Sequence, residues 1–269
     1  MKKIIALVDF SSNSMNAAKY AADLALSISA ELSLLHVLQI SLIAREMPAT
    51  EQVFEEIQDS ALESLNDLKK TLLRRTGGKI HISSNMEHGT VKHRLNEYCK
   101  QREPYIVVMG IAGNSLLRNI VGSNTLNAVN HLPYSLIIVP ENANFRPIHE
   151  IGVACDLTTA IGVFPVNYLK ELQQTFGARF ELLYVNTENE KEPSATALNL
   201  LKEQIQGLQP DFHFATTSKL DDGMNRLLED TKADLLLVIP KKHPIFEFHR
   251  SQFMKLALHC PVPVMVIHQ

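Results

Sequence analysis

Apolar and polar positions alternate along the first half of the chain in a pattern that predicts strands followed by helices. Short apolar, β-branched runs are bounded by turn residues or charges, as buried strands are. Strands are expected at residues 3–9, 31–38, 79–84, 106–110 and 135–139, and helices at 13–29, near 50–75 and after Gly89 and Thr90. The strands expected at 106–110 and 135–139 are continuously apolar in character, which is typical of parallel strands buried on both faces. The pattern predicts an α/β fold with a doubly wound, mainly parallel sheet.

The longest expected helix carries its apolar residues on one face. They recur at steps of three and four residues: Val53, Ile57, Ala61, Leu65, Leu68 and Leu72. Charged side chains, among them Glu55, Asp59 and Lys69, occupy the remaining positions. This spacing predicts an amphipathic helix that covers one face of the sheet.

The second half of the chain repeats the order of elements of the first. Residues 4–9, IIALVD, resemble residues 151–156, IGVACD, and the runs 32–37, 105–110 and 132–140 have counterparts at 180–185, 235–240 and 260–268. Residues 140–150 are rich in Pro and Asn and lack periodic apolar positions, as a linker does. We therefore expect two tandem domains, 1–142 and 147–269, each with a five-stranded sheet.

Composition indicates an ordinary globular protein. Of 269 residues, 45% are hydrophobic and 20% are charged, and the formal net charge is -3. This balance gives no electrostatic reason to expect binding to nucleic acid or to a membrane surface. No run approaches ~18 uninterrupted apolar residues, and Cys99, Cys155 and Cys260 form no C-x-x-C pair. We therefore expect a soluble protein of the reducing cytoplasm.

Asp9, Val37 and Gly110 stand where expected strands end. In a doubly wound sheet, ligands bind at the carboxyl ends of strands where the strand order reverses. If the first and fourth strands are neighbours, these three residues meet at one crevice. A carboxylate accepts from an exocyclic amine or a ribose hydroxyl, and a strand-end backbone pairs with a base edge, so a nucleotide fits. Asp9 with Ser11 and Ser12 also fits a simpler role, as the cap of the following helix.

A glycine-rich loop follows the fourth strand. It reads VVMGIAGNSLLRNIVGSNT from residue 107 to 125 and holds Gly110, Gly113, Gly122, Ser123 and Asn124. A strand that runs into glycines and then into a helix presents bare backbone N–H groups to a phosphate. Ser123 and Asn124 would donate at the start of the last helix of the domain. The alternative is a turn whose glycines serve only packing.

Together these features resemble the universal stress protein family, with two copies of its domain fused. The V-D-F-S stretch at Val8 to Ser11 is typical of that family. The loop resembles the family's ATP-binding pattern of Gly, two residues, Gly, nine residues, Gly and then Ser or Thr, although here eight residues separate Gly113 from Gly122. The resemblance implies Rossmann-like domains that bind ATP or another adenine nucleotide, with or without Mg2+. It implies that Asp9 and Val37 face adenine, Gly110 and Gly113 the ribose and first phosphates, and Gly122, Ser123 and Asn124 the phosphate tail.

The second half has lost the glycine loop. Pro240 stands where the first half has Gly110, and Phe246 and Phe248 follow it. Proline removes an N–H donor, and the aromatic rings add bulk where a backbone would approach a phosphate. We therefore expect nucleotide binding in the first domain and a regulatory or structural role for the second.

Catalysis is not assigned, because no nucleophile, base and polarising group form a recognisable set. His243, His249, His259 and His268 lack zinc-like spacing, so no metal site is expected. Two alternatives stay open. One is an interaction module that binds no nucleotide, which the eight-residue spacing favours. The other is a slow Mg2+-dependent ATPase, for which Asp9 is the only obvious nearby carboxylate.

The expected mechanism is a population shift, in which nucleotide orders residues 110–124 and changes affinity for an unidentified protein partner. The last strand of each half is apolar, and an exposed apolar edge invites pairing. The family resemblance implies that these two strands pair within one chain, and a homodimer stays open as well.

Overall fold

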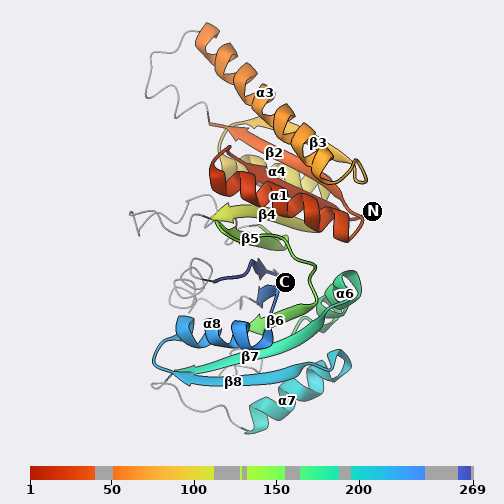
Figure 1. Ribbon diagram of the computed structural model, residues 1–269, viewed down its shortest axis with the longest axis vertical. Coiled ribbons are helices and arrows are strands. Elements are labelled where there is room, and N and C mark those ends of the chain that lie inside the picture. The colour runs from red at the N-terminus through yellow and green to blue at the C-terminus, as the bar shows by residue number, and fades with distance from the viewer. Residues whose placement is uncertain are drawn as a thin grey trace. The chain divides into compact units, whose positions relative to one another are not determined.

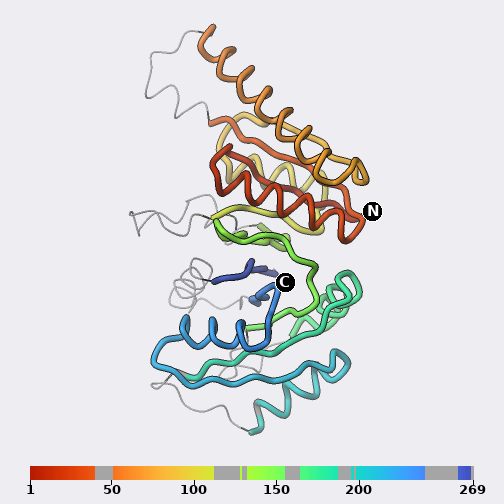
Figure 2. The backbone as a smooth tube through the Cα atoms, in the orientation of Figure 1, coloured from red at the N-terminus to blue at the C-terminus, as the bar shows by residue number. Residues whose placement is uncertain are grey.

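The computed structural model describes residues 1–39, 51–111, 128, 132–154, 164–187, 195–239 and 260–267 (Figure 2). The chain forms two compact units, Met1–Phe145 and Arg146–Gln269. The sequence-predicted domain limits, 1–142 and 147–269, lie close to these bounds. No helix among the described residues is long and apolar enough to cross a membrane.

The first unit holds a parallel sheet in the order β3-β2-β1-β4-β5. Its strands are β1 (Lys3–Val8), β2 (Glu31–Leu38), β3 (Ile82–His88), β4 (Ile106–Ile111) and β5 (Leu136–Pro140). From β1 the chain steps outward to β2 and β3, then returns to the other side of β1 to form β4 and β5. The strand order therefore reverses between β1 and β4, which is the neighbour relation that the candidate site requires.

Helices cover both faces of this sheet, as expected for a doubly wound α/β fold. They are α1 (Ser12–Ser27), α3 (Glu51–Arg75) and α4 (Val91–Arg102). Figure 1 shows α1 and α3 in front of the strands and α4 behind them. Between the layers, the apolar side chains of β1, β2, β4 and β5 are buried, and Ile4, Leu34, Val108 and Ile137 are fully so. The continuous apolar runs are thus the core of the unit.

Strand β3 begins and ends later than the sequence predicts. The expected strand was 79–84, whereas the ladder runs from Ile82, opposite Leu32, to His88, opposite Leu38. Gly77 and Gly78 both have a positive φ and turn the chain just before it. The edge position leaves β3 half-buried, so polar residues such as Ser84 and Asn85 are tolerated there. Hydrophobic periodicity therefore underestimates this strand at its carboxyl end.

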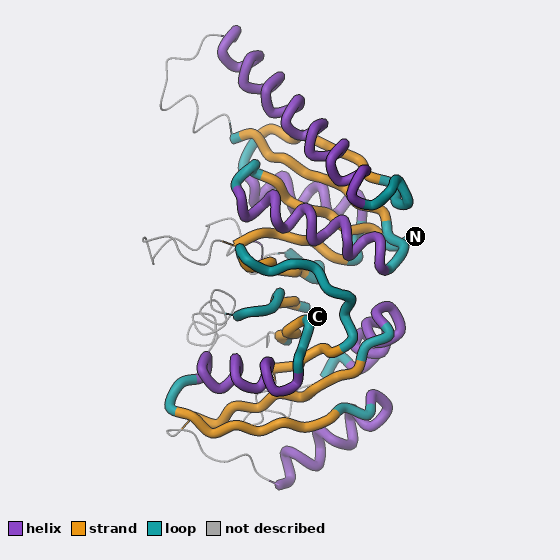
Figure 3. The backbone as a smooth tube through the Cα atoms, viewed as in Figure 1, coloured by secondary structure: helices purple, strands orange, loops and turns teal. Residues whose placement is uncertain are grey.

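Helix α3 packs on the sheet through its second half only. Leu65, Leu68 and Leu72 are buried, whereas Val53 and Ile57 are partly exposed. In Figure 3 the first turns of the helix extend beyond the strands of the unit. The predicted amphipathic face is present, but the sheet covers only its second half.

The second unit holds a parallel sheet in the order β8-β7-β6-β9-β10, the same relative order as in the first unit. Its strands are β6 (Glu150–Ala154), β7 (Arg179–Thr187), β8 (Asp211–Thr217), β9 (Leu235–Val238) and β10 (Val264–Val266). Its helices are α6 (Val166–Phe176), α7 (Ala195–Ile205) and α8 (Leu220–Thr231), with a 3-10 turn at Gln206–Leu208.

Helices α7 and α8 lie on opposite faces of this second sheet. Gly223 of α8 lies against Val185 and Thr217, which share one face. Lys202 of α7 lies over the ring of Phe212, which belongs to the other face. Both units are therefore sheets covered on two sides, and the α/β expectation is confirmed for each.

Candidate functional site

The carboxyl edge of the first sheet brings together three residues that the sequence predicts as a site. Asp9 follows the last residue of β1, and Val37 and Gly110 are the next-to-last residues of β2 and β4. Strand β1 pairs with β2 on one side and with β4 on the other. The condition set for the candidate site, that the first and fourth strands are neighbours, is therefore met, and all three residues lie at the carboxyl edge beside the switch point of the sheet.

Asp9 is held at this edge by the residues that start α1. Its Oδ1 accepts from the Ser11 backbone N–H at 3.0 Å and from Ser11 Oγ at 2.6 Å. Partial burial opposes ionisation of the carboxyl group, but the hydrogen bonds with Ser11 and Ser14 outweigh it and lower the pKa of Asp9 below its ordinary value. The carboxylate is therefore ionised at neutral pH. Both bonds from Ser11 use Oδ1 and leave Oδ2 to accept from other donors.

Ser11 also caps α1, which confirms the capping role expected for this segment. Its side chain accepts from the Ser14 backbone N–H at 3.3 Å. Ser14 Oγ in turn donates to the Ser11 carbonyl at 3.1 Å and accepts from the Asp9 backbone N–H at 3.2 Å. Capping and an open carboxylate oxygen thus coexist in the same six residues.

Phe10 and His36 also lie at this carboxyl edge, and the sequence does not predict the contact between them. Phe10 has φ 64°, a left-handed conformation that costs a bulky residue about 1–2 kcal/mol. Its ring packs on the His36 imidazole with centroids 4.6 Å apart. His36 is 8% exposed, and its Nδ1 lies 2.8 Å from the Val8 carbonyl. Because a carbonyl only accepts, Nδ1 carries the proton.

Gly110 lies against the first turn of α1. A Cβ at this position would stand 2.4 Å from the Asn13 carbonyl oxygen and 3.0 Å from the Ser14 nitrogen. The missing side chain therefore lets α1 approach β4, and contact between Gly110 and a ligand stays a prediction. The neighbouring Asn13 Oδ1 is buried and has no hydrogen-bond partner among the residues that the structure describes. A ligand hydroxyl or a water would satisfy this acceptor.

Four of the predicted site residues, Gly113, Gly122, Ser123 and Asn124, lie outside the described residues. The same holds for Cys155, for Pro240 and for the four histidines of the C-terminal region. Cys99 and Cys260 are buried, and burial raises the pKa of each thiol to about 12. A raised pKa disfavours the thiolate form, which is the nucleophile in cysteine chemistry.

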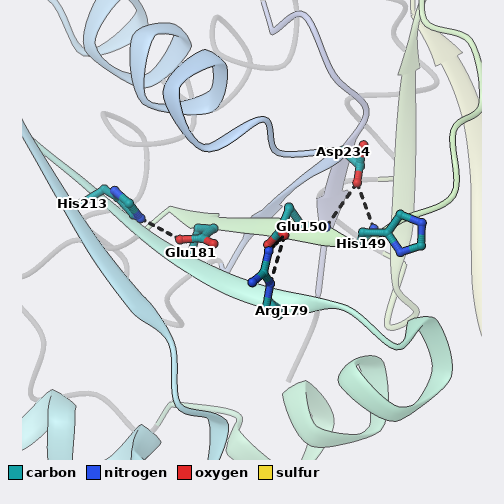
Figure 4. A network of polar contacts seen from close by, with 6 residues as sticks. All are labelled: His149, Glu150, Arg179, Glu181, His213 and Asp234. Carbon is teal, nitrogen blue, oxygen red and sulfur yellow. Dashed lines mark hydrogen bonds and ion pairs between the residues drawn. The ribbon is translucent and has the colours of Figure 1, made fainter.

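A second polar network lies at the opposite, amino edge of the second sheet (Figure 4). His213 Nε2 lies 2.6 Å from Glu181 Oε2, and Arg179 pairs with Glu150 on the neighbouring strand. Glu181 is only 7% exposed, and this burial raises its pKa despite the hydrogen bond with His213. The ionic side chains join β6, β7 and β8 where these strands begin.

Asp234 anchors the same edge to the entry of β9. Its Oδ2 accepts from the backbone N–H groups of His149 and Glu150 at 2.9 and 3.2 Å. Within the described ranges, no group of three or more His, Cys, Asp or Glu side chains is arranged to hold a metal ion. These contacts all run between neighbouring strands or their entries, so the network stabilises strand pairing.

The fold and its carboxyl edge define an α/β protein with Rossmann-like, doubly wound sheets. The chain belongs to the Universal stress protein family, whose model matches residues 1–140. Universal stress protein A homolog 1 of Coxiella burnetii is 28% identical over 138 residues, which are 49% of this chain and 90% of that protein. Universal stress protein MJ0531 of Methanocaldococcus jannaschii is 29% identical over 123 residues, 45% of this chain and 70% of that protein.

Solved structures share the fold along the whole chain. A universal stress protein from Archaeoglobus fulgidus DSM 4304 aligns with a TM-score of 0.74 and 17% identity, over 99% of this chain and 98% of its own. A functionally unknown protein, PA1789, from Pseudomonas aeruginosa PAO1 aligns with a TM-score of 0.61 and 12% identity, over 100% of this chain and 92% of its own. The fold of both halves therefore occurs in other proteins.

Proposed function

We propose that the first unit binds an adenine nucleotide, ATP in the simplest case, at the carboxyl edge of β1, β2 and β4. The observation that carries this proposal is the adjacency of β1 and β4, which gathers the ionised Asp9 carboxylate, the Val37 backbone and Gly110 at one switch point. Membership of the Universal stress protein family supports the same ligand class. The second unit has a structural or regulatory role.

The base end of the site fits a 6-amino purine. Asp9 Oδ2 and the Val37 carbonyl are both hydrogen-bond acceptors, and an exocyclic amino group carries two N–H donors. Asn13 lies in the first turn of α1 beside Gly110, and its Oδ1, which has no partner among the described residues, suits a ribose hydroxyl or a bridging water. The chain therefore offers acceptors to the donor groups of an adenosine.

The phosphate end rests on the sequence of the glycine loop. Gly113 and Gly122 would let phosphates approach backbone N–H groups, and Ser123 and Asn124 would add donors at a helix start. A bound Mg2+ would share the phosphate charge. The corresponding loop of the second unit has Pro240 and two phenylalanines, so one nucleotide per chain is the expected stoichiometry.

Nucleotide binding would act on partners through a population shift. A ligand that binds more tightly when the loop 110–124 is ordered shifts the protein toward that ordered state. The affinity of the adjoining surface for a protein partner then changes by an amount that the ligand's difference in affinity between the two states sets. A stress-response protein of the cytoplasm that reads nucleotide level in this way needs no catalytic step.

The proposal is tested by calorimetric titration of nucleotide-free protein with ATP, with and without Mg2+. We expect saturable binding of one ATP per chain. Asp9→Asn replaces an acceptor by a donor at the base and should weaken binding about tenfold or more. Gly113→Val blocks the backbone approach of the phosphates and should abolish binding. Asp59→Asn removes an exposed carboxylate of α3 and serves as the charge-matched control.

Absence of binding to the wild-type chain would refute the proposal and favour an interaction module without nucleotide. Binding that Asp9→Asn leaves unchanged would place the ligand elsewhere on the molecule.

A further inference from the structure

We propose that Phe10 is a positioning residue for the base end of this site, an inference that rests on the proposed function. Its left-handed backbone turns the chain away from β2. If β1 continued as a strand at this point, its backbone would donate a hydrogen bond to the Val37 carbonyl. The turn therefore withholds the Phe10 N–H from that carbonyl, which can then accept from a nucleobase.

The direction of the Val37 backbone groups follows from the hydrogen bonds at both ends of β2. The Leu32 N–H donates to the His81 carbonyl, and the Leu38 carbonyl accepts from the Gly89 N–H, so even-numbered residues of β2 face β3. The Glu31 N–H donates to the Lys2 carbonyl, so odd-numbered residues face β1. The N–H and C=O of Val37 therefore point toward the β1 side.

The register identifies the group that would pair with the Val37 carbonyl. His36 lies opposite Val8, which places Val37 opposite Asp9. In a parallel ladder a carbonyl accepts from the residue that follows its opposite partner, and this residue is Phe10. However, β1 ends at Val8, Phe10 has φ 64°, and no bond from the Phe10 N–H to Val37 is present among the described residues.

Contacts on both sides hold Phe10 in this unfavourable conformation. On one side, its ring packs on His36, which is fixed to the Val8 carbonyl through Nδ1. On the other side, the Ser11 N–H and hydroxyl both bind Asp9 Oδ1, which closes the turn around Phe10. A strained residue persists only where its surroundings determine its conformation in this way.

The consequence is a ligand preference that can be measured. The Val37 carbonyl and Asp9 Oδ2 stand at the same edge, and both accept hydrogen bonds. They suit a base with an amino group at position 6 and oppose one with a carbonyl oxygen there. The wild-type chain should therefore prefer ATP to ITP, which differ at this position.

A graded series at position 10 tests the role of the backbone. Glycine adopts positive φ freely, alanine at moderate cost, and β-branched valine at the greatest cost. We expect Phe10→Gly to bind ATP within about threefold of the wild type and Phe10→Val to bind about tenfold or more weakly, with Phe10→Ala between them. The preference for ATP over ITP should fall in the same order. Hydrogen exchange at the residue 10 amide should slow in Phe10→Val as this amide joins the ladder with Val37.

The outcomes separate this inference from the proposed function. If the wild-type chain bound neither triphosphate, the proposed function would fall and the inference with it. If the wild type bound ATP but the glycine and valine variants showed equal affinity and an equal ATP to ITP ratio, only the inference would be overturned. If Phe10→Val does not fold, the alanine and glycine variants are compared instead, by their affinity for ATP and by their ratio of ATP to ITP affinity.

Discussion

At the scale of single residues, the start of α1 shows how one short segment combines stability with an exposed charge. Asp9, Ser11 and Ser14 satisfy one another through five hydrogen bonds. These bonds stabilise the ionised form of Asp9 against the cost of partial burial. The Ser11 cap of α1 and the Asp9 carboxylate therefore share one hydrogen-bond network, and a change in either residue affects both.

Ser11→Ala should raise the pKa of Asp9 and destabilise the fold by about 1 kcal/mol, because it removes the shortest bond to the carboxylate and the cap. The folded pKa of Asp9 lies below the ordinary 3.8, so its contribution to stability is present above that value and is lost as pH falls through the folded pKa. The variant should lose less stability in this acidic window than the wild type. Carboxyl NMR titration and urea unfolding at several pH values measure both effects. Ser12→Ala, at an exposed neighbour, is the control, and equal effects of the two variants would contradict the account.

Gly110→Ala should destabilise the protein by about 1–3 kcal/mol, because the new Cβ would overlap the Asn13 backbone rather than a movable side chain. Urea denaturation of both proteins measures the difference. Gly207→Ala is a matched control, since its Cβ would meet only the end of the flexible Lys170 side chain, and it should change stability by less than about 0.5 kcal/mol. A neutral Gly110→Ala would mean that α1 shifts without cost.

At the scale of elements, α3 is one helix with two different environments. Its second half is fixed by buried leucines and by Arg75, whose guanidinium forms a two-pronged ion pair with Asp23 of α1. Its first half offers partly exposed apolar side chains, such as Val53 and Phe54. Helix propensity and periodicity are alike in both halves, so packing alone distinguishes them.

Leu68→Ala should therefore cost about 2–5 kcal/mol, whereas Leu62→Ala, less than two turns away, should cost less than about 0.5 kcal/mol. Leu68 is 2% exposed and Leu62 is 37% exposed. Thermal or urea unfolding of the two variants measures the contrast. Similar losses at both positions would show that the first half of α3 is covered as well as the second.

At the scale of the whole molecule, the two units share a strand order but differ in their polar interiors. In the first unit, the hydroxyls of Ser33, Ser83 and Tyr98 bond to one another beneath α4. In the second, the strand that corresponds to β2 carries Glu181 in place of Ser33, paired with His213. The units are thus not interchangeable, and pairing between their last strands stays a prediction.

Saturating ATP should slow hydrogen exchange at the carboxyl edge of the first unit and leave the corresponding edge of the second unit unchanged. The expected region of protection includes residues 9–12 and Val37, and the reference region is the end of β7. Binding stabilises the unit that holds the ligand, and the stabilisation grows with the logarithm of the ligand concentration relative to Kd. Equal protection of both edges would contradict the asymmetry that Pro240 predicts. Exchange mass spectrometry on the full chain measures both.

Several features of the site can be predicted from the sequence, because they depend only on residue type and order. Asp9 and Gly110 are found where apolar runs end, and the strand-end position of Val37 follows from the run that contains it. Phe10 and His36 are not found in this way, because no side-chain pattern announces a positive φ or a ring contact between distant residues. The bounds of β3 also differ from those that the sequence predicts, since an edge strand tolerates polar residues that weaken the hydrophobic signal.

The α/β class, the alternation of strands and helices and the residues at the strand ends follow from the order of amino acids, because periodicity and turn residues are local properties. The folded chain is needed to show that β1 lies beside β4 and that Gly110 makes room for α1. It is also needed to show that the Val37 carbonyl points to the side where β1 has already turned away. These features depend on which distant segments meet and in what register. Contacts between residues far apart in the chain, such as Val8 with His36, set that register.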